Sequence, residues 1–122
     1  MTKRILIMDD EDAIRDVLKE VLERLGNTVS VSKEGNEALS LYEKAFNSGK
    51  TFDVVSLDLT VEEGMDGKET MKNLLRFDPK VKAVIFSGNI TEDIEKNYES
   101  YGIKGIIKKP FIKELVDLID SL

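Results

Sequence analysis

The stretch ILIMDDED at residues 5–12 decides the fold of this chain. Its apolar part, residues 5–8, is followed at once by two aspartates. An unbroken apolar run of this length is typical of a strand in a parallel sheet that is covered by helices on both faces. Apolar residues then recur at the spacing of one helical face over 12–25, and Gly26 stands where helices commonly end. The stretch therefore predicts a buried strand that leads directly into a helix.

The same pattern of a strand followed by a helix repeats along the chain. Further short apolar runs, rich in β-branched residues, indicate strands at 29–31, 54–57, 81–86 and 105–107. Helical spacing of apolar residues indicates helices between and after them, at 36–47, 68–77, 91–101 and from Ile112 onward. The predicted order of elements is therefore βαβαβαβαβα.

The second strand differs from the others because Val29 and Val31 alternate with polar residues, which is typical of an edge strand. The continuous runs belong in the interior of the sheet. With right-handed crossovers, this asymmetry predicts an α/β fold: a doubly wound, flavodoxin-like (βα)5 sheet with parallel strands in the order 2-1-3-4-5. A chain of 122 residues has the length of one domain, so we expect a single domain over residues 1–122.

The composition disfavours several classes of function. Eighteen basic and 24 acidic residues give a net charge of −6, so nucleic acid and anionic membrane surfaces are not expected partners. The absence of cysteine and histidine removes thiol and imidazole groups as nucleophiles, acid–base catalysts and metal ligands. No apolar run approaches the length of a signal-peptide core or a membrane span, so we expect a cytoplasmic protein. Any chemistry therefore depends on carboxylates, hydroxyls, lysines and the backbone.

Acidic residues follow two of the predicted strands. Asp9 and Asp10 come directly after the first strand, and Asp58 follows the third. Acids that precede a helix are also favoured by its N-terminus, so Asp9 and Asp10 taken alone fit either a capping role or a ligand role. In a doubly wound sheet, however, the carboxyl ends of strands one and three meet where the winding reverses. Three carboxylates there would repel one another without a cation, and oxygen ligands of this kind favour Mg²⁺.

Ser87 and Lys109 follow strands four and five, so they belong to the same edge of the sheet. A serine before a glycine is commonly a turn residue, and a single lysine is commonly a surface residue, so each also has a purely structural interpretation. At this edge, however, a hydroxyl and an ammonium group suit phosphoryl oxygens. Three carboxylates, one lysine and one Mg²⁺ together carry no net charge, which suits phosphoryl transfer. We therefore predict that Asp58 is a carboxylate nucleophile that forms an aspartyl phosphate.

Four motifs resemble the receiver domain of two-component response regulators, and the resemblance covers the whole chain. The motifs are ILIMDDED at 5–12, FDVVSLDLTVEEGMDG at 52–67, VIFSG at 84–88 and KKPF at 108–111. The resemblance implies a CheY-like fold and a stand-alone response regulator that signals by conformational change or phosphorelay. It also implies a signalling protein rather than a classical enzyme. Such a signalling protein takes part in its own phosphotransfer and autodephosphorylation.

The resemblance assigns roles to individual residues. Asp58 matches the phosphoacceptor, which also contacts the metal. Asp10 matches the direct Mg²⁺ ligand, Asp9 matches the carboxylate that holds the metal through water, and the backbone carbonyl of Thr60 matches a further ligand. The switch hydroxyl and the lysine that pairs with the phosphoryl group are matched by Ser87 and Lys109.

The resemblance also implies a partner, a sensor histidine kinase that donates the phosphoryl group from a phosphohistidine. Its helical hairpin would dock on the first helix and on the loop before the fifth, where Ile14, Pro110 and Phe111 are the predicted contact residues. Val17, by contrast, is expected in the core. The protein is expected to be monomeric. Because no DNA-binding segment follows the fifth helix, output is expected through docking or through transfer of the phosphoryl group.

Two positions depart from the family pattern. The loop after Asp58 is one residue longer than the common form and carries Glu62 where a proline is often found. In this it is similar to receivers associated with PAS-containing and hybrid sensor kinases. Ile106 stands where many receivers carry a tyrosine or phenylalanine that turns inward together with the switch hydroxyl. The switch hydroxyl itself is present as Ser87, whereas the aromatic side chain is not.

Two other functions are consistent with parts of this pattern. A small Mg²⁺-dependent phosphatase with a carboxylate nucleophile would also place an aspartate at a strand end. Such enzymes usually need a second acid two residues later, where this chain has Thr60, and a cap over the substrate. A flavin-binding electron carrier shares the fold, but it requires a phosphate-binding loop after the first strand, where this chain has acids. Both alternatives fit less well than a receiver.

Overall fold

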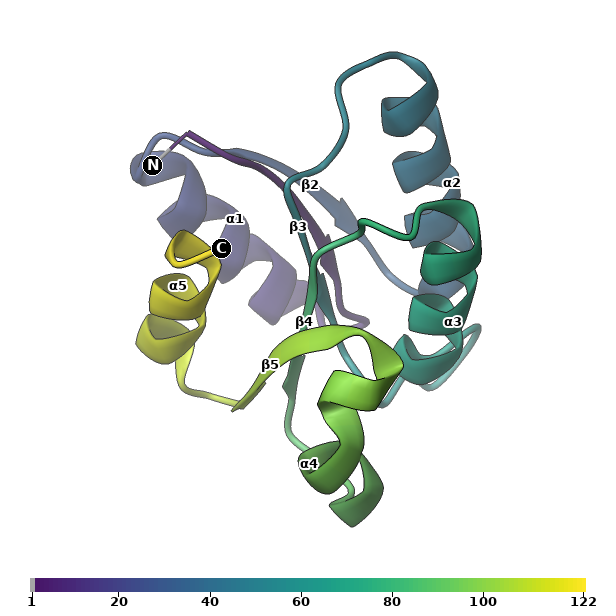
Figure 1. Cartoon of the computed structure of the whole chain (residues 1–122). Coiled ribbons are helices and arrows are strands. Elements are labelled where there is room, and N and C mark those ends of the chain that lie inside the picture. The colour runs from purple at the N-terminus through teal and green to yellow at the C-terminus, as the bar shows by residue number, and fades with distance from the viewer. Residues whose placement is uncertain (1) are drawn as a thin grey trace.

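Strands and helices alternate along the computed structural model, which describes residues 2–122 (Figure 1). The strands are β1 (Arg4–Met8), β2 (Thr28–Ser32), β3 (Val54–Leu57), β4 (Ala83–Ser87) and β5 (Ile103–Lys108). The helices are α1 (Asp12–Arg24), α2 (Gly35–Asn47), α3 (Gly67–Phe77), α4 (Glu92–Asn97), the 3₁₀ helix η1 (Tyr98–Tyr101) and α5 (Ile112–Asp120). β4 and β5 each begin two residues away from the predicted position, later and earlier respectively. Within residues 2–122, no helix combines the length and the apolar character that crossing a membrane requires.

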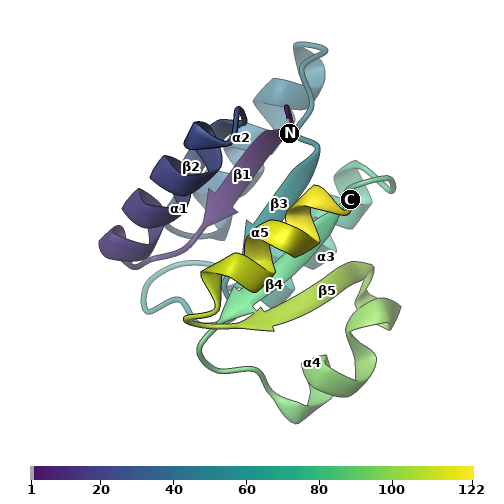
Figure 2. The same ribbon diagram turned by 90° about the vertical axis from the view of Figure 1, so that its left-hand side faces the viewer.

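The strands form one parallel sheet in the order β2-β1-β3-β4-β5. The predicted doubly wound, flavodoxin-like topology is therefore confirmed, with β2 at an edge. β1 lies between β2 and β3, so that Ile5 pairs with Val29 on one side and with Val54 on the other. The strand arrows all point the same way (Figure 2), and their carboxyl ends therefore share one edge of the sheet.

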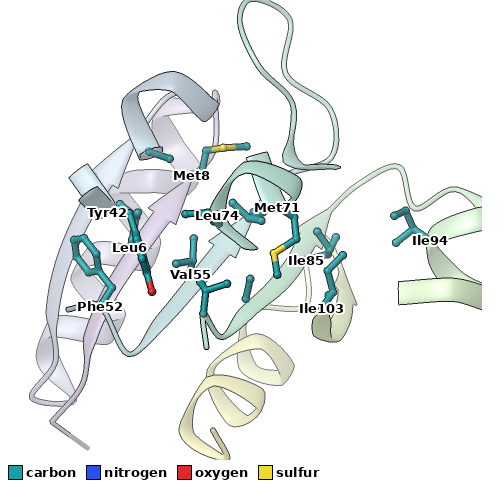
Figure 3. Packing of buried hydrophobic residues seen from close by; sticks show 14 residues of the cluster. Leu6, Met8, Tyr42, Phe52, Val55, Met71, Leu74, Ile85, Ile94 and Ile103 are labelled. Atoms are coloured by element: carbon teal, nitrogen blue, oxygen red, sulfur yellow. The ribbon is translucent and has the colours of Figure 1, made fainter. Parts of the chain in front are cut away.

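Alternate residues of the strands face opposite layers of helices. In β1, Leu6 and Met8 pack in the core under α2, α3 and α4, whereas Ile5 and Ile7 pack in the core under α1 and α5. Figure 1 shows α2 and α3 on one side of the sheet and α1 and α5 on the other, and Figure 2 looks onto the layer of α1 and α5. Figure 3 shows the first of these cores. Because the interior strands β1, β3 and β4 are covered on both faces, their side chains are held by packing up to the strand ends.

The predicted helix over 91–101 consists of two elements. α4 ends at Asn97, whose φ of −122° and ψ of 12° leave the helical range, and the tighter η1 follows. The Ser100 hydroxyl donates to the Asn97 carbonyl at 2.7 Å, a local bond that competes with the α-helical pattern. Gly102 then ends the segment in the left-handed conformation, with a φ of 81°. The two tyrosines of η1, Tyr98 and Tyr101, are half-buried.

Three apolar side chains that periodicity assigned to the inner faces of helices are exposed. Val17 on α1, Leu25 at the end of α1 and Phe46 on α2 expose 41%, 47% and 40% of their surface. The prediction that Val17 belongs to the core is therefore wrong. The inner face of α1 consists of Arg15, Leu18 and Leu22. Residues three or four positions apart share one face of a helix, as Arg15, Leu18 and Leu22 do. Val17 does not fall at this spacing from them, so its side chain points away from the sheet.

Glu34 fastens the loop between β3 and α3 to the start of α2. Its carboxylate accepts the backbone N–H groups of Asn36 and Glu37, which caps α2, and also that of Met65 at 3.0 Å. Gly64 in this loop has a φ of 105°, and a Cβ there would lie 2.5 Å from Glu34 Oε2. Burial would raise the pKa of the Glu34 carboxyl, but the three N–H groups hold it below its ordinary value. The loop is thereby held at the carboxyl edge of the sheet.

Candidate functional site

The candidate site is built by extending the parallel ladders one residue beyond the strand ends. The Asp58 N–H donates to the Met8 carbonyl at 3.1 Å, which places Asp58 beside Asp9. The Lys109 N–H donates to the Ser87 carbonyl at 3.0 Å, which places Lys109 beside Ser87. The backbone therefore fixes where four of the predicted site residues leave the sheet.

The three predicted carboxylates converge. One oxygen from each of Asp9, Asp10 and Asp58 lies within 4.8 Å of the others. Asp9 and Asp58 are buried, and Asp10 is half-buried. A cavity of about 360 Å³ opens beside them, and its lining includes Asp10, Asp58, Thr60, Ser87 and Lys109. The residues that the sequence predicted as site residues therefore share one place in the fold.

Lys109 lies among these acids. Its Nζ is 2.8 Å from Asp9, 3.0 Å from Asp58 and 3.0 Å from Glu11, and its side chain is only 13% exposed. Burial alone would lower the pKa of the Lys109 ammonium, but its hydrogen bonds to Asp9, Glu11 and Asp58 raise it above its ordinary value. The ammonium is therefore firmly charged and neutralises part of the acidic cluster.

Burial acts on the pKa of Asp9 in the opposite direction from its effect on the pKa of Lys109. The loss of hydration raises the pKa of the Asp9 carboxyl above its ordinary value, although hydrogen bonds from Lys109 and from the Glu11 N–H oppose the shift. The nearby charge of Asp58 raises the pKa further. This carboxylate is therefore kept in the pocket against a cost in hydration and repulsion, which a bound cation would relieve.

The donor set fits Mg²⁺. The grouped ligands are carboxylate oxygens, and Thr60, whose carbonyl is the predicted further ligand, lines the cavity. Hard oxygen donors without nitrogen or sulfur favour Mg²⁺, Ca²⁺ or Mn²⁺. A site with few protein oxygens leaves room for water and phosphate oxygens, which is the coordination that Mg²⁺ prefers.

The loop after β3 closes over the carboxylates. The Thr60 N–H donates to Asp58 Oδ1 at 3.2 Å, and the Glu62 N–H donates to Asp10 Oδ2 at 3.0 Å. At the far end of the loop, a Cβ on Gly67 would lie 2.4 Å from the Asp58 carbonyl oxygen, so α3 starts in close contact with the site. The longer loop with Glu62 therefore orients the acids through its backbone.

Ser87 is the last residue of β4. It is fully buried, and it belongs to the lining of the cavity. Its Oγ accepts the N–H of Asn89 at 3.3 Å, which ties the hydroxyl to the loop that leads to α4. Ile106, where an aromatic residue is common in receivers, is half-buried on β5 and packs against the core under α3 and α4. Ser87 is thus in place for the predicted switch role, whereas position 106 offers only an aliphatic side chain.

Two residues near the site were not predicted. Glu11 reaches Lys109 across 98 positions in the sequence. The buried Arg15 donates to the Asp9 carbonyl at 2.7 Å and pairs with Asp12, and so holds the turn after β1. A signal for Arg15 exists in the sequence, because it shares the helical face of Leu18. Glu11 shows no comparable pattern.

The predicted partner residues lie apart from the cavity lining. Ile14 is half-buried and packs against the core under α1 and α5. Pro110 is exposed after a cis peptide bond with Lys109, and Phe111 is 54% exposed. Together with Val17, they offer apolar surface on α1 and on the turn before α5.

Comparisons with known proteins agree with this geometry. Residues 5–120 match the family described as response regulator receiver domain. The chain is 30% identical to the chemotaxis protein CheY of Thermotoga maritima, over 91% of this chain and 88% of that protein. It is also 30% identical to the sporulation initiation phosphotransferase F of Bacillus subtilis, over 98% of this chain and 92% of that protein.

A solved structure leads to the same family. The structure of the CheX–CheY–BeF3–Mg²⁺ complex from Borrelia burgdorferi contains a chain that is similar to this one with a TM-score of 0.87 and 25% identity, covering 98% of this chain and 87% of that chain. The fold, the cluster of acids at the strand ends and the family match over residues 5–120 lead to one conclusion. This chain belongs to the response regulator receiver domains, the phosphoacceptor domains of two-component signalling.

Proposed function

We propose that this protein is a response regulator whose Asp58 accepts a phosphoryl group from the phosphohistidine of a sensor histidine kinase, in a reaction that depends on Mg²⁺. The observation that carries the proposal is the convergence of Asp58 with Asp9, Asp10 and Lys109 beside one cavity. The proposal includes a single receiver domain, a monomeric protein and a cytoplasmic location.

The chemistry assigns a separate task to each group. An oxygen of Asp58 attacks phosphorus, the bond between phosphorus and the histidine nitrogen breaks, and its electron pair stays on the imidazole. The Lys109 ammonium, 3.0 Å from Asp58, is placed to meet a phosphoryl oxygen. Mg²⁺, held by Asp10, Asp58 and the Thr60 carbonyl, with Asp9 acting through water, would neutralise charge on the phosphoryl oxygens. Slow hydrolysis of the same adduct would constitute autodephosphorylation.

Conformational change would start at Ser87. Its buried hydroxyl lines the cavity and is tied to the loop before α4 by the Asn89 N–H. Turning the hydroxyl toward a phosphoryl oxygen would break that bond and move the loop, and with it α4. With Ile106 at the aromatic position, the change would pass through this loop rather than through a ring on β5.

The kinase would dock on the apolar surface of α1 and of the turn before α5. Phe111 is more than half exposed, Pro110 is exposed and Ile14 is half-buried. Lys109 directly precedes Pro110, so a helical hairpin on this surface would bring its phosphohistidine to the cavity. The exposed Val17 adds a further apolar contact.

The test is phosphorylation by acetyl phosphate in the presence of Mg²⁺, followed by intact-protein mass. We expect wild-type protein to gain one phosphoryl group that acid and hydroxylamine remove, and we expect Asp58→Asn to gain none. Asp16→Asn, at an exposed position on α1, serves as the matched control and should be phosphorylated like the wild type. A phosphoryl group on the Asp58→Asn protein would contradict the assignment. Transfer from an autophosphorylated kinase then tests the partner.

A further inference from the structure

Glu11 occupies the N-cap position of α1, yet within residues 2–122 its side chain accepts no hydrogen bond from the first turn of the helix. The serine, threonine, aspartate and asparagine side chains that are preferred at this position accept such a bond. The Glu11 carboxylate instead lies 3.0 Å from Lys109 Nζ and lines the cavity. Its backbone N–H is held by Asp9 Oδ1 at 2.9 Å. The residue is therefore oriented toward the pocket and not toward its own helix.

This placement changes the charge of the pocket. Lys109 has three N–H donors, and it meets three carboxylates, those of Asp9, Glu11 and Asp58. Asp9, Asp10, Glu11, Asp58, Lys109 and one Mg²⁺ together carry one net negative charge, and the same groups without Glu11 carry none. Glu62, which is exposed and also lines the cavity, adds one further negative charge in both cases. The Glu11 carboxylate is therefore not needed to balance Lys109 and the metal.

Glu11 also differs from the other acids in its exposure. The side chains of Asp9 and Asp58 are 2% and 4% exposed, whereas the side chain of Glu11 is 58% exposed. Asp12, the first residue of α1, pairs with Arg15 instead. A phosphodonor that enters the cavity therefore passes the Glu11 charge before it reaches Asp58. Repulsion there grows with the negative charge of the donor.

We propose that Glu11 is a specificity-determining residue of this pocket, which disfavours strongly anionic small phosphodonors relative to donors of lower charge. This inference rests on the proposed function of Asp58 as the phosphoacceptor. It names the class of donor that the pocket disfavours, which is the small acyl phosphates with two negative charges.

Two small phosphodonors of different charge distinguish an effect of the pocket charge from a displacement of Lys109 or Asp58. Acetyl phosphate carries two negative charges, and its transfer breaks the bond between phosphorus and the acyl oxygen and releases acetate. Phosphoramidate carries one net negative charge near neutral pH, and its transfer breaks the bond between phosphorus and nitrogen and releases ammonia. Both leave the same aspartyl phosphate. A change that merely moves Lys109 or Asp58 therefore affects both rates, whereas a change in pocket charge affects their ratio.

The experiment measures the phosphorylation rate of wild type and of Glu11→Gln with each donor below saturation, at constant ionic strength and with Mg²⁺ raised to saturation for each variant. We expect the ratio of the acetyl phosphate rate to the phosphoramidate rate to rise about two- to fivefold in Glu11→Gln, as for a unit charge near an exposed site. Added salt should raise the wild-type ratio toward that of the variant, because it screens the exposed charge.

Two variants serve as controls. Glu23→Gln makes the same change of charge at an exposed position near the far end of α1, and we expect the wild-type ratio. Glu11→Asp keeps the charge beside the pocket, and we expect a ratio close to that of the wild type. Thermal unfolding of each variant confirms that it is folded.

The outcomes distinguish the inference from the proposed function. An unchanged ratio in Glu11→Gln overturns the inference, and this includes the case in which both rates fall equally because Glu11 only positions Lys109. The absence of any aspartyl phosphate in the wild type with both donors overturns the proposed function instead.

Discussion

Lys109 joins three carboxylates that would otherwise repel one another. Its Nζ lies within 3.0 Å of Asp9, Glu11 and Asp58, and its side chain is largely enclosed. The same ammonium has two tasks in the proposed reaction. It stabilises the pocket before phosphorylation, and it meets the phosphoryl group afterwards. The two tasks can be tested separately, because saturating Mg²⁺ would relieve the repulsion among the acids even where the ammonium is absent.

Replacement of Lys109 by alanine should therefore reduce phosphorylation by acetyl phosphate about 100-fold, the usual effect of removing one group that stabilises transition-state charge. The melting temperature without metal should fall, because the acids lose their counter-charge, and saturating Mg²⁺ should restore much of the loss. Adduct formation is followed by mass, and unfolding by circular dichroism. Lys108→Ala, at the exposed neighbouring position, is the control. A Lys109→Ala protein that is phosphorylated at the wild-type rate would contradict the role of the lysine.

The residues of the pocket were predictable to different degrees. Asp9, Asp58 and Lys109 directly follow strands, and Ser87 is the last residue of one. Because parallel strands end at one edge, the topology alone brings these residues together. The contact of Glu11 with Lys109 was not predictable in this way. It depends on the direction of one exposed side chain at a helix start, where acids are common for other reasons.

The segment α4–η1 is tied to α3 by a polar network. The Tyr101 hydroxyl donates to Asp93 at 2.7 Å, Asn97 donates to the same carboxylate at 3.0 Å, and Lys68 of α3 lies 3.1 Å from it. Lys68 also lies over the Tyr101 ring, 4.9 Å from its centroid. Hydrogen bonds from Tyr101 and Asn97, and the bond from Lys68, lower the pKa of Asp93 from 3.8 to about 2. The network therefore holds the short helix at low pH only while Asp93 is ionised.

This shift predicts a pH dependence. Because the pKa of Asp93 is lower in the folded chain, ionised Asp93 stabilises the fold above about pH 3.8, and this contribution disappears as the pH falls toward about 2. The melting temperature of the wild type should exceed that of Asp93→Asn near neutral pH, and the gap should narrow across this range. Asp117→Asn, whose carboxylate lies 3.6 Å from Lys113 at an exposed site, should show a smaller gap throughout. A gap for Asp93→Asn that stays constant down to pH 2 would contradict the network.

The helices themselves illustrate where sequence periodicity is sufficient. The predicted helices over 36–47 and 68–77 each begin within one residue of the observed start, because an acidic side chain caps each of them. The division of 91–101 into α4 and η1 was not predicted, because the apolar spacing continues through it while the backbone changes at Asn97. Exposed Val17 and Phe46 show the same limit, since periodicity does not reveal how wide the covered face of a helix is.

The whole molecule combines a net charge of −6 with three grouped carboxylates at one edge of its sheet. Repulsion among these acids opposes folding, and a cation that binds only the folded pocket should favour it. The topology that groups them was predictable, because the interior strands are mostly apolar while the edge strand β2 alternates apolar and polar residues. The distances within the pocket were not, because they depend on how the loop after β3 is held by Glu34.

Saturating Mg²⁺ should therefore raise the melting temperature of the wild type. At about 100 times the dissociation constant, the expected gain in the free energy of unfolding is about 2.7 kcal/mol. Asp10→Asn should need more Mg²⁺ for the same gain, whereas Asp16→Asn, on the exposed part of α1, should behave like the wild type. Differential scanning calorimetry across a Mg²⁺ titration measures both. A melting curve of the wild type that does not move would count against a metal site at these acids.

The pocket takes its side chains from strand ends that are distributed along the chain, with Asp9 after β1 and Lys109 after β5. The ribosome therefore delivers Asp58, the proposed phosphoacceptor, well before Lys109, which lies beside it. Incomplete chains, and chains in which β5 has detached from the sheet, have the acids without Lys109. We expect such chains not to be phosphorylated by the kinase. We therefore expect only molecules with the complete five-stranded sheet to be phosphorylated efficiently.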